Sequence, residues 1–184
     1  DLTLLGIEGA SISGEYVPGD FASSVTALDV LDSKVTLQNV TINSGRYGVF
    51  CSDRSICTLR DVIVLGGHYG VAAQGQSALD ILGATQIQDS EVWGVSAFGA
   101  SRVNMRPNWD AGFDPAEPGP SVSGHSVGAW VMDGSFFRSD NVAFTANGTG
   151  IVAQRDVMIK VFSNESGLGV TDSVGEGIIV RQNS

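Results

Sequence analysis

Residues 55–76 read SICTLRDVIVLGGHYGVAAQGQ, and this stretch decides the fold of the chain. It contains three short runs in which apolar residues recur at every second position. The apolar positions of the three runs are Cys57 and Leu59, then Val62 and Val64, then Val71 and Ala73. Such alternation is typical of a strand that buries one face. The stretch therefore predicts three short strands separated by turns.

The same pattern recurs along the chain. It starts at Ser33, Ser55, Ser77, Ser101, Ser135 and Val157, at spacings of 22, 22, 24, 34 and 22 residues. A glycine precedes the third run of successive periods, at Gly48, Gly70, Gly94, Gly128, Gly150 and Gly177. Three strands per period of roughly 22 residues predict an all-β solenoid whose coils stack ~4.8 Å apart. We expect the glycines at one corner, where a positive φ or the close approach of the next coil requires them.

Aromatic residues precede three of these glycines, at Tyr47, Tyr69 and Trp93. Because they share one offset in the repeat, they are predicted to stack as a column along three coils. Two interpretations stay open, a ladder that covers the corner glycines and a platform for sugar rings. The residues expected beside the column are Arg46, His68 and Glu91.

Composition narrows the class of protein. The chain has 184 residues, 24 of them glycine, and a formal net charge of −10. A single domain is expected over 1–184, with irregular first coils over 1–32. The net charge argues against a general binder of nucleic acid or of anionic membranes, and no apolar run is long enough to span a membrane. Neither end carries a recognisable cap, so we expect a segment of a longer chain or ends covered by partner subunits.

The cysteines and the search for ligand-binding motifs add little information about function. Two cysteines are too few for a disulfide framework, and Cys57 is predicted to act as a small hydrophobe in the core. The recurring serines are interpreted as turn residues. No zinc, calcium or phosphate-binding motif is present, so the sequence predicts neither a metal site nor a cofactor.

The repeat over 33–161 resembles the right-handed parallel β-helix of pectate lyases, polygalacturonases, alginate epimerases and bacteriophage tailspikes. The resemblance implies a pectin-lyase-like, right-handed parallel β-helix solenoid. Tailspikes are often trimers that bind polysaccharide, so it also implies a homo-oligomer or further domains of the same chain. The implied location is extracellular or on a virion surface.

The longest period contains an insertion over 107–126, rich in proline, aromatic residues and carboxylates. Aromatic faces stack on sugars and carboxylates accept hydrogen bonds from hydroxyl groups, which favours a saccharide contact. The alternative is a loop whose aromatic residues pack on the coil beneath. The predicted ligand-binding residues are Trp109, Asp110, Phe113, Asp114, Glu117 and His125.

Residues 112–115, Gly-Phe-Asp-Pro, resemble part of the catalytic motif of alginate C5-epimerases. The resemblance implies a catalytic role for Asp114. The histidine and tyrosine of that motif are replaced by Ala116 and Ala111. The match to the family's motif therefore covers the carboxylate and leaves out its two partners.

Three functions follow as hypotheses. The first is a polysaccharide-recognition or adhesion domain, tailspike-like or tail-fibre-like, without catalysis. The second is a polysaccharide lyase, hydrolase or epimerase in which Asp114 acts with Glu117 or Asp110 as acid and base. The third is a structural spacer that holds other domains apart.

Overall fold

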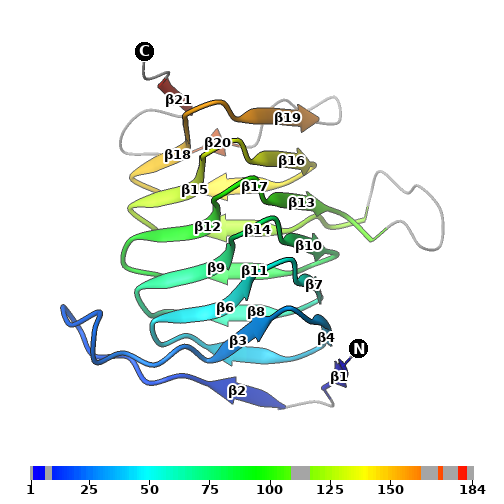
Figure 1. The fold of residues 1–184 in the computed structure, drawn as a ribbon, viewed down its shortest axis with the longest axis vertical. Helices are drawn as coiled ribbons and strands as arrows, with labels where there is room; N and C mark the ends of the chain where they lie inside the picture. The colour runs from blue at the N-terminus through cyan, green and yellow to red at the C-terminus, as the bar shows by residue number, and fades with distance from the viewer. Residues whose placement is uncertain (1, 7–9, 109–116, 163–169, 172–177, 182–184) are drawn as a thin grey trace.

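The computed structural model describes residues 2–6, 10–108, 117–162, 170–171 and 178–181. These residues form 21 strands in three parallel sheets of seven, and the described part of the chain contains no helix. Successive strands belong to successive sheets, so each coil contributes one strand to each sheet (Figure 1). The chain is therefore an all-β parallel β-helix, as the repeat predicts. Among the described residues, no helix is long and apolar enough to cross a membrane.

We name the sheets A, B and C in the order in which a coil visits them. Sheet A consists of β1 (Leu2–Leu5), β4 (Lys34–Gln38), β7 (Ile56–Arg60), β10 (Ala78–Leu82), β13 (Arg102–Arg106), β16 (Phe136–Asp140) and β19 (Met158–Phe162). Sheet B consists of β2 (Ser11–Ser13), β5 (Thr41–Asn43), β8 (Ile63–Leu65), β11 (Gln86–Gln88), β14 (Ser121–Ser123), β17 (Ala143–Thr145) and β20 (Val170–Thr171). Sheet C consists of β3 (Leu28–Leu31), β6 (Tyr47–Ser52), β9 (Tyr69–Ala73), β12 (Trp93–Ala97), β15 (Val127–Met132), β18 (Thr149–Gln154) and β21 (Ile178–Arg181).

The register of the strands reproduces the sequence period. In sheet A, Cys57 pairs with Val35 on one side and with Leu79 on the other. Both offsets are 22 residues, and equivalent inward positions therefore stack into apolar columns along the axis. The largest fully buried side chains come from these columns and include Phe137, Phe144, Leu37 and Ile42. Each such side chain contributes about 1.5–3 kcal/mol relative to exposure.

Three kinds of corner join the sheets. Corner one, between sheets A and B, turns through a single left-handed residue, as at Asn39 (φ 55°), Asp61 (φ 53°) and Asn141 (φ 51°). Asn and Asp tolerate this region better than most residues, which explains their recurrence there. Corner two, between sheets B and C, holds the repeat glycines. At Gly48 an added Cβ would lie 2.8 Å from the carbonyl oxygen of Gly70. Close approach of the next coil therefore explains the corner-two glycine.

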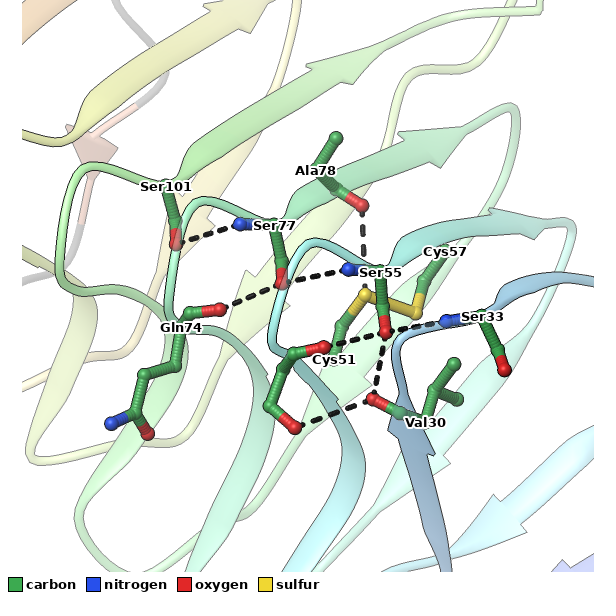
Figure 2. Close-up of a disulfide and its surroundings, with 10 residues drawn as sticks. Val30, Ser33, Cys51, Ser55, Cys57, Gln74, Ser77, Ala78 and Ser101 are labelled. Carbon is green, nitrogen blue, oxygen red and sulfur yellow. Dashed lines mark hydrogen bonds between the residues drawn. A yellow bond between two sulfur atoms is a disulfide. The ribbon is translucent and has the colours of Figure 1, made fainter.

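Corner three, between sheets C and A, contains a ladder of serines. Ser55, Ser77, Ser101 and Ser135 are buried there. The backbone N–H groups of Ser33, Ser55, Ser77 and Ser101 donate to the next serine's Oγ at 3.1, 3.1, 3.2 and 3.2 Å. Figure 2 shows this chain of hydrogen bonds from coil to coil. The recurring serines are thus turn residues, as predicted, and they also connect neighbouring coils.

A disulfide joins Cys51 on β6 to Cys57 on β7 beneath this ladder (Figure 2). Both residues are buried, and they face inward on two strands that meet at corner three. Cys57 therefore lies in the core, as predicted, but the prediction that it acts as a small hydrophobe misses its disulfide bond. The chain enters corner three from β6 of sheet C and leaves it in β7 of sheet A. This change of direction brings the two inward-facing sulfur atoms together.

Candidate functional site

The outward faces of the three sheets differ in chemistry. The described strands of sheet A carry six basic and two acidic residues. The described strands of sheet B carry no Asp, Glu, Lys or Arg. Sheet C carries the aromatic residues Tyr47, Phe50, Tyr69, Trp93 and Trp130. A ligand would therefore meet a basic, a neutral or an aromatic surface, depending on the face that it approaches.

The aromatic column on sheet C forms as predicted. The ring centroids of Tyr47 and Tyr69 lie 4.8 Å apart, and those of Tyr69 and Trp93 lie 4.3 Å apart with an interplanar angle of 20°. Each ring thus covers a face of the next. Trp130 continues the column edge-to-face, with its centroid 4.8 Å from that of Trp93. Because the faces of Tyr69 are occupied by its neighbours, the geometry favours a packing ladder over a sugar platform at that position.

The end of the column that is nearest the N-terminus, at Tyr47, is covered by the strap. We define the strap as residues 14–27, between β2 and β3. Phe21 of the strap packs edge-on against Tyr47 and Tyr69, and the Arg46 guanidinium lies 4.0 Å from the centre of the Phe21 ring. The strap's backbone pairs with corner two through the Arg46 N–H, which donates to the Val25 carbonyl at 3.0 Å. These contacts give the strap a small core of its own.

A histidine and a carboxylate meet beside the strap. The His68 Nδ1 lies 2.5 Å from an oxygen of Glu91, and the Tyr16 hydroxyl donates to the same carboxylate at 3.4 Å. The His68 side chain is 6% exposed, and its Nε2 has no hydrogen-bond partner among the described residues. Arg46, His68 and Glu91 therefore lie beside the column, as the sequence predicts, with His68 closed off by the strap.

Burial changes the ionisation of the column. Loss of solvent around the Tyr47 phenol raises its pKa to about 12, with a further rise from Tyr69 and an opposing effect of Arg46. An unfolded tyrosine ionises near pH 10. The neutral phenol of the folded state therefore stabilises the protein below pH 10, and this contribution is lost as the pH rises toward 12.

We expect the Tyr47→Phe variant to lose the phenol that titrates near pH 12. The chain has three tyrosines, so an absorbance titration can resolve them. The thermal midpoint of the wild type should fall between pH 10 and 12, and the fall should be smaller in Tyr47→Phe. Tyr16→Phe is the matched control because Tyr16 lies outside the column, and it should retain the step near pH 12. An unchanged titration of Tyr47→Phe would contradict the assignment.

The residues predicted to bind or cleave a saccharide fall mainly between β13 and β14. Trp109, Asp110, Phe113 and Asp114 lie outside the described residues. Glu117 is half-buried, and its Oε2 is buried without a hydrogen-bond partner in the described part of the chain. Because β14 begins at Ser121, the connection that carries all five residues is 107–120, at corner one beside sheet A.

His125 lies at corner two, away from that connection along the coil. Its Nδ1 accepts a hydrogen bond from the Ser90 N–H at 3.0 Å, and its Nε2 lies 3.0 Å from the Ile87 carbonyl oxygen. These partners fit a neutral ring that carries its proton on Nε2. Burial lowers the His125 pKa, which also favours the neutral form. His125 thus connects two coils through backbone groups.

The basic face of sheet A is the feature that sequence analysis missed. Its residues are Lys34, Arg60, Arg102, Arg106, Arg138 and Lys160. Five of the seven strands of this sheet show the pattern e-B-i-B-i or i-B-i-B-B, in which exposed or half-buried residues alternate with buried ones. The bases on these strands occupy the outward positions, and Lys160 on β19 is exposed. The available signal was the phase of the repeat, because all six bases fall in the first strand of a period.

A comparison with protein-family models, curated proteins and solved structures finds no significant match to this chain. The parallel β-helix architecture therefore stands on the strands and their register, and function has to be argued from the surfaces just described.

Proposed function

We propose that this chain is a glycan-recognition domain that binds a cell-surface polysaccharide without cleaving it, in the manner of a tailspike or tail fibre. The observation that carries the proposal is the outward face of sheet A, a stack of strands with polar outward columns beside the 107–120 connection. One such column contains Thr36, Thr58, Asp80, Asn104, Arg138 and Lys160. A linear polymer that crosses successive coils would meet a hydrogen-bonding group on each.

Location and assembly belong to the same proposal. Disulfides persist mainly in oxidising compartments, so the Cys51–Cys57 bond supports an extracellular or virion-surface location. We further propose that the domain works in a homo-oligomer, as in trimeric tailspikes, or beside other domains of the same chain. Light scattering of the purified protein measures this directly, and a monodisperse monomer would count against the oligomer.

The test of recognition uses the 107–120 connection. We expect bacterial surface polysaccharides on an array to bind the wild type and to bind Trp109→Ala roughly fivefold to thirtyfold more weakly, because a stacking aromatic contributes on the order of 1–2 kcal/mol. Pro118→Ala is the matched control, since it changes the same connection without removing an aromatic or acidic group. Equal binding by all three proteins would contradict the role of Trp109, and the absence of binding to any polysaccharide would contradict recognition.

A second candidate is catalysis by loop carboxylates. It is favoured by the buried Oε2 of Glu117, which has no hydrogen-bond partner among the described residues. In this hypothesis Asp114 works with Glu117 or Asp110 as acid and base. Incubation with acidic and neutral bacterial polysaccharides, followed by chromatography of the products, separates the two candidates. Depolymerisation that is abolished by Asp114→Asn would replace the recognition proposal with an enzymatic one.

A further inference from the structure

We propose that the outward face of sheet A is an anion-binding surface whose ligand is a polyanionic glycan, one that carries carboxylate or sulfate groups along its length. The inference rests on the proposed function, because it names the charge class of the polysaccharide. It starts from the separation of charge in the fold. The chain has a net charge of −10, yet the described strands of sheet A carry six basic residues against two acidic ones.

The two acidic residues of this face are already engaged. Asp80 accepts a hydrogen bond from the Asn104 amide at 2.7 Å. Asp140 is buried and accepts from the Arg138 guanidinium, with an Nη2–Oδ2 distance of 2.7 Å. Lys34 and Arg102 are exposed, and no carboxylate of the described residues lies within ion-pair distance of either. The positive charges of Lys34 and Arg102 are therefore available to a ligand.

A depression of about 320 Å³ lies where sheet A meets corner three. Arg54 and Arg102 both line it, together with Gln76 and the apolar Ile56 and Ala78. Arg54 reaches the Asp32 carboxylate at 3.6 Å, but both side chains are about 70% exposed, so this pair is weak and open to competition. Two guanidinium groups beside apolar carbons suit an acidic sugar, whose ring is apolar and whose acid group accepts paired hydrogen bonds.

The spacing of the charges fits a polymer better than a small anion. Lys34 and Arg102 occupy the same outward column three strands apart, a separation of roughly 14 Å at ~4.8 Å per strand. Lys160 lies two strands beyond Arg102 on β19, in the neighbouring outward column, where it pairs with Arg138. A chain that runs along the solenoid axis would meet these cations in succession, held in place by a rigid sheet.

A glycan fits this face better than a nucleic acid. Nucleic-acid binders neutralise many closely spaced phosphates and commonly stack bases on aromatic rings. The Phe136 ring on this face has the Lys160 ammonium 5.9 Å from its centre, and the aromatic column lies on sheet C.

The test compares four immobilised polymers, which are heparin, polygalacturonate, neutral dextran and single-stranded DNA. The variant Lys34→Gln/Arg102→Gln/Lys160→Gln removes three positive charges from sheet A. The control Asn43→Asp/Gln86→Glu/Ser123→Asp changes the net charge by the same amount on sheet B. Circular dichroism and thermal midpoints establish that both variants fold. If the triple variant does not fold, Arg102→Gln alone is measured in its place.

We expect the wild type to bind heparin and polygalacturonate, more weakly at about 0.5 M salt than at low salt. The sheet A variant should bind them about tenfold more weakly, and the sheet B control should bind as the wild type does. An equal loss in both variants, or DNA binding as tight as that of the glycans, would overturn the inference. If uncharged bacterial surface polysaccharides bind while the polyanions do not, the inference fails and the proposed function stands. If no glycan binds, both fail.

Discussion

The Gly70→Ala variant should lose about 3 kcal/mol or more of its free energy of unfolding, enough to unfold a marginally stable chain. Gly70 is buried at corner two in the middle of the solenoid. An added Cβ would collide with the carbonyl oxygen of Gly94 in the next coil, and it would lie 2.6 Å from the Ile87 Cγ2. The backbone of the next coil cannot move aside without breaking the register of β9 and β12. Denaturant unfolding measures the loss.

Gly134→Ala is the matched control for this prediction. Gly134 lies at corner three with a φ of 72°, and an added Cβ would have no atom within 4 Å. This substitution therefore carries only the strain of a left-handed alanine, about 1–2 kcal/mol. Equal losses in the two variants would show that backbone conformation, and not contact between coils, explains the corner-two glycines.

Removal of the disulfide in Cys51→Ala/Cys57→Ala should lower the free energy of unfolding by about 2–4 kcal/mol. The bond closes a short loop around corner three, with a sequence separation of 6, so it restricts the unfolded chain. The substitution also takes volume from the core, because Cys57 packs in the column between Val35 and Leu79. Denaturant unfolding with and without a reducing agent is the measurement.

The reducing agent provides the control. The wild type should approach the stability of the double variant when reductant is present, because the unfolded chain then loses its cross-link. The double variant has no cysteine left and should be insensitive. A wild-type protein whose unfolding is the same under both conditions would contradict a stabilising role for the bond.

The sequence period predicts the scaffold because each structural feature recurs at a fixed offset. Val35, Cys57 and Leu79 are placed in one inward column by spacing alone, and the structure pairs them so. The pairing of Cys51 with Cys57 was beyond that argument, since the two cysteines belong to different strands and meet only when the chain turns corner three. The packing of Phe21 on Tyr69 is also invisible in the repeat, because the strap has no equivalent in other coils.

The candidate site is harder to predict than the scaffold, for a related reason. Trp109 and Asp114 attract notice through residue type, but the repeat says nothing about how an inserted segment is arranged. The basic face behaves in the opposite way. Lys34, Arg102 and Lys160 are far apart in sequence and look unremarkable in a chain of net charge −10. Only the phase of each strand shows that these residues share a surface. The net charge of the whole chain does not reveal that basic residues gather on one sheet.

The serine ladder at corner three has a consequence for how such a chain can change. The link from Ser101 to Ser135 spans a coil of 34 residues, yet its N–O distance of 3.2 Å equals that of the link from Ser77 to Ser101. The extra residues lie between β13 and β14, at corner one, so their number does not affect the stacking of the coils. Corner one can therefore accept segments of different length and composition while the stacked coils stay the same. The stacking of the coils therefore depends on the strands and the serine ladder, and it does not depend on the length of the corner-one segment.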